Sequence, residues 1–284
     1  MQRSHKREIQ PATLSGTKAS ADLLTVIAIS SLAYVVAVGM HEFGGHALAC
    51  VLLGIRLKGL GAFYISYDGS HVPELSRRIV AIAGAAMGTI TGMASWIVLR
   101  YLPLRRSHAL YFFWLFGTFT LLISTGALIS GISGIGDFGA TADGALYRIH
   151  PEWLWRTVIA VLGFLAYSRV ARLSVRRLDG FLGGGAERIK HAKFLALTSY
   201  FTGGIVSLLI GMLNPRGIVI VLVSAAASSL GGTSALVWMT KWINPSQHSP
   251  APKELELRQH WGWISVSLLV TAAYAIVFGP TLHP

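Results

Sequence analysis

The chain has 284 residues, of which 53% are hydrophobic and 13% are charged. A soluble domain has about 25% charged residues, so this composition excludes an ordinary soluble globular protein and indicates a multi-pass integral membrane protein. The formal net charge is +12, but the basic residues lie in the loops between apolar stretches. The positive-inside rule and anionic lipid explain them, so we expect the lipid bilayer rather than nucleic acid as a partner.

The first 20 residues are polar and basic and predict a disordered tail. The first apolar stretch, residues 21–53, is longer than the roughly 20 residues that cross a bilayer. It is therefore either a tilted helix or two helical pieces that meet near Gly39.

Three ionisable residues interrupt the first apolar stretch: His41, Glu42 and His46. A charge in hydrocarbon costs at least about 2.5–3.5 kcal/mol, so such a cluster indicates a functional site. Imidazole nitrogens are ligands of Zn²⁺, and a carboxylate between them can act as a base towards water. The cluster therefore predicts a metal-dependent hydrolase.

The spacing of the two histidines differs from the usual zinc-peptidase motif, His-Glu-x-x-His, in which the ligands are four residues apart. Here they are five apart, and an α-helix would direct their rings roughly 140° away from each other. A π-bulge would realign them, and Gly44 and Gly45 reduce its conformational cost. Alternatively, Glu42 and His46 form the aligned pair and His41 lies behind them. A non-metal interpretation also exists, in which the histidines bond a neighbouring helix and the glycines allow close packing.

Residues 54–78 interrupt the helical pattern. Residues 55–58 alternate between apolar and basic, residues 62–67 are rich in aromatic side chains, and Asp68-Gly69 is a strong turn signal. This predicts a short, membrane-associated β-hairpin whose edge could pair with an extended peptide. A plain surface loop is the alternative.

Six further apolar stretches follow, so we expect an all-α polytopic membrane protein with about seven transmembrane helices. They are residues 79–101, 109–135, 153–173, 194–213, 218–239 and 261–278. Gly84, Gly88 and Gly92 recur every four residues, a pattern typical of close helix contact. We expect residues 21–156 to form the functional core and residues 157–284 an accessory transmembrane bundle.

The third ligand is expected from the glycine-rich segment 130–139. In this segment Asp137 comes directly after the apolar residues of the third span. Flexible backbone at membrane depth is tolerated only where it is buried in protein or lines a cavity, so we favour Asp137 as the carboxylate ligand. Asp143 is the alternative, although it is farther from the apolar run and could be a turn residue.

The motif from His41 to Ala49, the predicted hairpin, the glycine-rich span and the later aspartate resemble the site-2 protease family of intramembrane zinc metalloproteases. The similarity covers roughly residues 21–156 and is greatest to a small bacterial branch. It implies a three-span core with Zn²⁺ held by His41, His46 and Asp137. Glu42 would then be the catalytic base.

The same resemblance implies a water-accessible cavity, membrane-embedded or membrane-proximal peptide substrates, and a location in the bacterial cytoplasmic membrane. The chain departs from the family pattern in the extra glycine of the first motif. It also has Gly-Ile-Gly before Asp137 where the family usually carries Asn and Pro before Leu-Asp-Gly, and Asp143-Gly144 is similar to that last pair.

A different class of function fits some of the same residues. Intramembrane histidines and an aspartate also suit a metal or proton transporter, or a non-catalytic relative of the peptidases. Glu42 distinguishes the two, because a transporter needs ligands but no base beside the metal.

Overall fold

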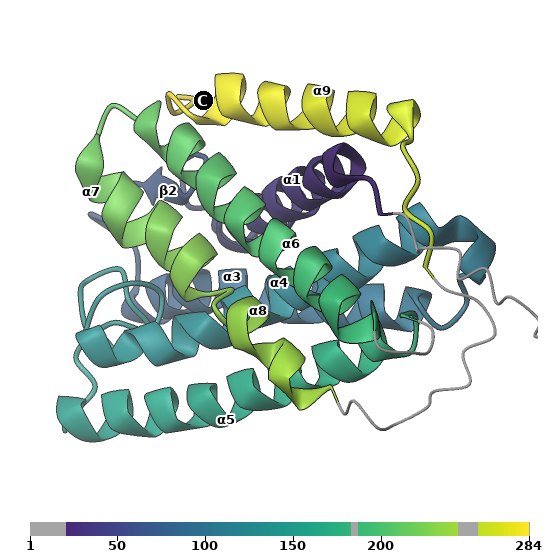
Figure 1. Ribbon diagram of the computed structural model, residues 1–284. Coiled ribbons are helices and arrows are strands. Elements are labelled where there is room, and N and C mark those ends of the chain that lie inside the picture. The colour runs from purple at the N-terminus through teal and green to yellow at the C-terminus, as the bar shows by residue number, and fades with distance from the viewer. Residues whose placement is uncertain (1–20, 183–186, 244–254, 284) are drawn as a thin grey trace, which may run out of the picture.

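The computed structural model describes residues 21–182, 187–243 and 255–283 (Figure 1). The predicted disordered tail, residues 1–20, lies outside these ranges. The first span consists of α1 (Leu23–Gly39), the π-helix η1 (Met40–Ala47) and α2 (Leu48–Leu52). The elements that follow are β1 (Leu57–Gly61), β2 (Tyr64–Tyr67), α3 (Glu74–Val98), η2 (Leu104–Arg106), α4 (Ser107–Ser130), η3 (Gly131–Ser133), α5 (Glu152–Asp179), α6 (Glu187–Met212), α7 (Ile218–Ile220), the π-helix η4 (Val221–Gly231), α8 (Ala235–Trp238), η5 (Met239–Trp242) and α9 (Trp261–Phe278).

The described residues include six helices that are long and apolar enough to cross a membrane. They are Leu23–Leu52, Glu74–Val98, Leu104–Ser133, Glu152–Asp179, Arg188–Met212 and Trp261–Phe278. A multi-pass membrane protein is therefore confirmed, whereas the predicted number of about seven spans is not.

The difference lies in residues 218–239, which were expected to form one span. In the structure this stretch is divided into α7, η4 and α8. The backbone N–H of Gly232 donates to the carbonyl of Ala227 at 2.7 Å, a bond across five residues, and the chain then turns before α8. Gly231 and Gly232 contribute no side chain that could stabilise a continuous α-helix at this point.

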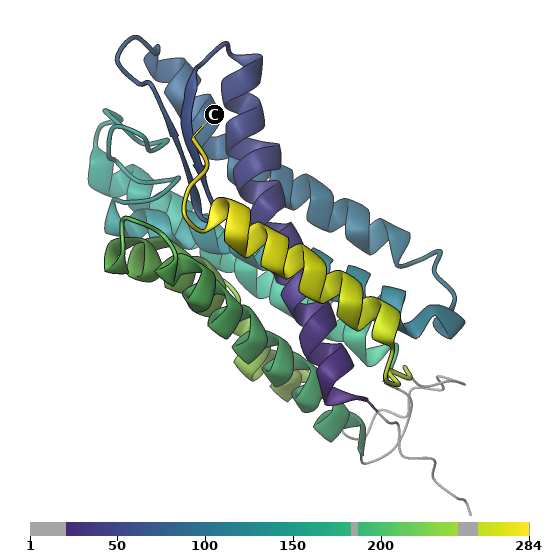
Figure 2. The same cartoon turned by 90° about the horizontal axis from the view of Figure 1, so that it is seen from above.

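The first span is one continuous helix rather than two pieces, but its geometry changes from α to π at Met40. Asp22 caps its start, because the Asp22 carboxylate accepts a hydrogen bond of 2.8 Å from the backbone N–H of Thr25. The α1 helix packs against α4, α6 and α9, so helices from both halves of the sequence surround it (Figures 1 and 2).

Hydroxyl groups join the helices at the centre of the bundle. The Tyr111 hydroxyl of α4 lies 2.6 Å from that of Ser199 in α6, which accepts a hydrogen bond of 3.1 Å from Ser30 in α1. All three side chains are buried. This shared network satisfies polar atoms that have no access to water.

The predicted β-hairpin is present as the antiparallel pair β1–β2, but its turn was predicted at the wrong place. The strands pair Gly61 with Tyr64, so the turn is Ala62-Phe63 and not Asp68-Gly69.

Contacts with the end of the chain explain the position of this turn. Ala62 donates its N–H to the carbonyl of Phe278 at 2.8 Å and accepts a hydrogen bond from the Tyr274 hydroxyl at 2.6 Å. Leu282 then bridges Leu60 on the other edge of β1, and Figure 2 shows this extended segment beside the hairpin. Hydrogen bonds to distant residues thus override the local turn signal.

The predicted close helix contact is confirmed for two of the three glycines in α3. A Cβ on Gly92 would lie 2.5 Å from the Thr120 hydroxyl oxygen of α4, and one on Gly88 would collide with the hydroxyl of Ser124. The α3 and α4 helices can approach this closely only because both positions lack a side chain. Gly84 faces the candidate site instead.

Candidate metal centre

The π-helix η1 brings His41 and His46 together. The sequence predicted this distortion from the five-residue spacing, and the structure confirms it: Leu48, which follows η1, directs its N–H to the carbonyl of Phe43, five residues earlier. Residues five apart therefore share a face, and the Nε2 atoms of the two imidazoles lie 3.1 Å from each other. His41 does not lie behind the other two residues, as the alternative arrangement required.

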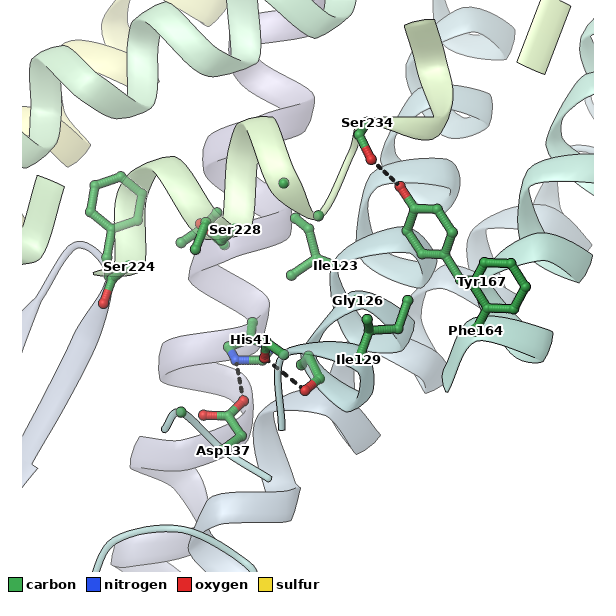
Figure 3. Close-up of a pocket in the computed structure, with 18 of the residues that line it drawn as sticks. His41, Ile123, Gly126, Ile129, Asp137, Phe164, Tyr167, Ser224, Ser228 and Ser234 are labelled. Atoms are coloured by element: carbon green, nitrogen blue, oxygen red, sulfur yellow. Dashed lines mark hydrogen bonds and ion pairs between the residues drawn. The ribbon is translucent and has the colours of Figure 1, made fainter. Parts of the chain in front are cut away.

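Asp137 completes a cluster with the two histidines. Its carboxylate oxygens lie 3.1 Å from His41 Nε2 and 3.5 Å from His46 Nε2, and Figure 3 shows the carboxylate directed at the His41 ring. All three side chains offer a ligand atom within 4.8 Å of the others. Four ligands at about 2.0–2.1 Å around a tetrahedral zinc are about 3.3 Å apart, so the cluster fits such an ion.

The hydrogen bonding of the two histidines leaves their Nε2 atoms available to bind a metal. The Nδ1–H of His46 donates to the carbonyl of Val80 at 2.7 Å. A neutral imidazole with a proton on Nδ1 carries its lone pair on Nε2, and this is the atom directed at the cluster. Among the described residues His41 Nδ1 has no hydrogen-bond partner, and its Nε2 is the nitrogen that faces His46 and Asp137.

Gly84 of α3 provides the space for both rings. A Cβ at this position would lie 2.7 Å from His41 Nε2 and still closer to His46 Nε2. It would therefore occupy the space of the two imidazole rings and of any ion held between them. Gly45 of η1 contacts the same glycine, since its own Cβ would lie 2.5 Å from the Gly84 Cα.

A folded loop after η3 positions Asp137. Gly134 and Gly136 have φ angles of 83° and 79°, which strain any residue with a Cβ. The Asp137 carbonyl accepts a hydrogen bond of 2.8 Å from the N–H of Ala145. The loop thus closes on itself around the aspartate, which explains why the segment contains so many glycines.

Asp143, the alternative ligand, does not lie in this cluster. It is exposed and accepts a hydrogen bond of 3.3 Å from the hydroxyl of Tyr67 in β2. Burial and the neighbouring Asp143 carboxylate raise the pKa of Tyr67 to about 12, so Tyr67 keeps its proton and can donate it. Asp143 therefore links the loop to the hairpin, and the geometry favours Asp137 as the ligand.

Glu42 lies in the wall of a cavity of about 880 Å³ that also exposes His41 and Asp137. Its carboxylate is buried in the protein, and no described residue donates a hydrogen bond to it. A carboxylate beside the cluster that is committed to no protein partner can interact with water or ligand in the cavity.

Much of the cavity wall comes from the second half of the chain, to which the sequence assigned no chemistry. Ser224 and Ser228 belong to η4, and Phe164 and Tyr167 to α5 (Figure 3). No motif marks them, because a cavity is defined by distant residues that line it together.

Together, the fold and the cluster define a multi-pass membrane protein with a candidate His-His-Asp metal centre beside a cavity. No protein-family model matches the chain, and neither a curated protein nor a solved structure matches it. The function is therefore argued from the chemistry of the site.

Proposed function

We propose that the protein is an intramembrane zinc metallopeptidase that hydrolyses peptide bonds of membrane-embedded or membrane-proximal substrates. The observation that supports it most is the arrangement of the cluster. His41, His46 and Asp137 converge within ligand distance, and Glu42 lies next to them in the same cavity.

The donor set suits zinc. Two imidazole nitrogens and one carboxylate oxygen match the three-ligand sites of catalytic zinc, which retain one open position. When bound, Zn²⁺ supplies a Lewis acid that polarises a carbonyl group and makes water more acidic.

Glu42 is the proposed general base. It accepts a proton from the attacking water and then donates it to the leaving amine, so that one carboxyl group serves both proton transfers. Glu42 lines the cavity of about 880 Å³, which provides space for water and an extended peptide segment.

A peptide bond within a helix is protected by its own hydrogen bonds, so the substrate has to unwind and needs new partners for its backbone. Within the described residues, β1 is bonded on both edges, by β2 and by the Leu282 bridge, whereas β2 is paired only with β1. The outer edge of β2 is therefore the proposed place for an extended substrate.

The test is Glu42→Gln in the purified, zinc-supplemented protein, incubated with a mixture of transmembrane peptides. New peptide termini are identified by mass spectrometry, and bound zinc is measured in parallel. We expect zinc to be retained and cleavage to fall by at least about 10²-fold. Glu74→Gln, which removes a half-buried carboxylate at the start of α3 that pairs with Arg78 and does not line the cavity, is the control and should cleave normally.

The competing function is movement of a metal ion or proton, since the cluster opens onto a large cavity. A transporter needs the ligands but not the base. If Glu42→Gln retains wild-type activity in metal uptake by vesicles, and no peptide is cleaved by the wild type, the peptidase proposal is wrong.

A further inference from the structure

The cavity carries charge at two separate places. One is the cluster itself, with Glu42 and Asp137; the other is Arg172 of α5. Of the described residues that line the cavity, Arg172 is the only lysine or arginine. A single guanidinium in an otherwise mainly apolar and hydroxyl-bearing wall can determine which ligand binds.

Arg172 stacks on an aromatic ring and has no anionic partner among the described residues. Its guanidinium lies over the ring of Trp242, 5.3 Å from the ring centre, and Trp242 in turn contacts Trp238, which also lines the cavity. No acidic side chain in the described part of the chain forms an ion pair with Arg172. Stacking on an aromatic ring leaves the edge of a guanidinium free to bind a carboxylate through two hydrogen bonds.

Helix packing gives the separation between the cluster and Arg172 along the direction of the helices. Gly88 of α3 faces Ser124 of the antiparallel helix α4. Gly84, which faces the histidines, precedes Gly88 by one turn and is therefore level with Leu128, one turn after Ser124.

Contacts of α5 with α4 relate positions along α5 to the level of the cluster. A Cβ on Gly163 would lie 2.7 Å from the Leu128 Cβ, so Gly163 is at the level of the cluster. Arg172 follows Gly163 by nine residues in α5, which is about 13 Å along the helix axis. An extended peptide covers about 3.3 Å per residue, so this axial separation alone corresponds to about four residues.

We propose that Arg172 forms an anion-binding subsite for an acidic side chain or terminal carboxylate of the peptide, about four residues from the bond that is cleaved. This inference rests on the proposed peptidase function and adds a substrate class to it: extended membrane peptides with an acidic residue at that separation. The Trp242 ring positions the guanidinium, and the apolar wall between the two ends accommodates the intervening side chains.

The test uses a peptide that the wild-type protein cleaves, with Glu or Gln placed at each position from one to six residues on either side of the cleaved bond. We expect kcat/KM to favour Glu over Gln by roughly tenfold about four residues away on one side, because a hydrogen bond to a charged group discriminates by about this much. Arg172→Gln should remove this preference while the Gln peptides are cleaved as before. Arg172→Lys should retain part of it.

Arg176→Gln is the matched control, because Arg176 is one turn farther along α5 and is exposed like Arg172, but does not line the cavity. This variant should keep the full preference for Glu. A wild-type enzyme that cleaves Glu and Gln peptides equally at every position, or an unchanged preference in Arg172→Gln, overturns the subsite. Failure of the wild type to cleave any peptide overturns the proposed function and the subsite together.

Discussion

At Gly84 the absence of a side chain makes room for the candidate centre. The two histidine rings occupy the position that a Cβ would take, and the α3 backbone lies directly behind them. The candidate ligands and the neighbouring glycine are therefore interdependent, although the glycine pattern in the sequence indicated only helix packing.

Gly84→Ala should abolish metal binding, because the added methyl group lies within 2.7 Å of His41 Nε2. The measurement is zinc content per chain after purification and zinc supplementation. Gly88→Ala is the control, since it crowds the same helix contact one turn away, against the Ser124 side chain. Equal zinc content in Gly84→Ala and the wild type would contradict the proposed position of the metal.

Single substitutions also test whether Asp137 or Asp143 is the carboxylate ligand. Asp137→Asn should lose the metal because the carboxylate that faces both imidazoles becomes a weaker, neutral ligand. Asp143→Asn should retain it, because Asp143 contacts Tyr67 and not the cluster. The same zinc measurement decides, and loss of zinc only in Asp143→Asn would reverse the assignment.

The element that matters most for the centre is the π-helix η1. It places two histidines five residues apart on one face, and it does so where two consecutive glycines meet α3. The glycines have different roles. Gly45 lies against backbone atoms of α3, whereas Gly44 faces the flexible side chains of Met40 and Met87.

Gly45→Ala and Gly44→Ala should therefore differ. The Cβ of Gly45→Ala would lie 2.5 Å from the Gly84 Cα, and the backbone there cannot yield without separating the helices. We expect a loss of about 1–3 kcal/mol in stability, together with loss of zinc. Gly44→Ala meets methionine atoms at 3.2 Å and 3.3 Å, which can rotate away, and should remain folded and bind zinc. Thermal unfolding in detergent compares the two, and equal stability would show that the contact between η1 and α3 is not tight.

Across the whole molecule, the centre links segments that are distant in the sequence. The first span supplies both histidines, the Val80 carbonyl of α3 orients one of them, and the loop after η3 supplies Asp137. A metal bound by both histidines and Asp137 should therefore stabilise the folded state and not only the site.

Zinc at 100 times its dissociation constant should add about 2.7 kcal/mol to the free energy of unfolding, provided that the unfolded chain does not bind it. The melting temperature in detergent should accordingly fall when a chelator removes the metal and recover when zinc is restored. His46→Ala, which lacks one ligand, should melt at the same temperature with and without zinc. A similar zinc effect in this variant would place the stabilising ion elsewhere.

The local features of the structure could be predicted from the sequence because they depend on near neighbours. The apolar stretches indicated the membrane spans, the five-residue separation of His41 and His46 indicated a π-helix, and the recurring glycines indicated close packing. The predictions failed at two places. The distant bonds of Ala62 to α9 set the hairpin turn, and the consecutive glycines Gly231 and Gly232 interrupt the span that was expected over residues 218–239.

By itself the sequence determined that the protein spans a membrane several times and that His41, Glu42 and His46 form one cluster, since hydrophobicity and helical spacing act over a few residues. Only the tertiary structure decided that Asp137 rather than Asp143 faces the histidines, that Gly84 makes room for them, and that Arg172 shares their cavity. These facts depend on which helices pack together, and packing is determined by the combined contacts of the whole chain rather than by any one segment.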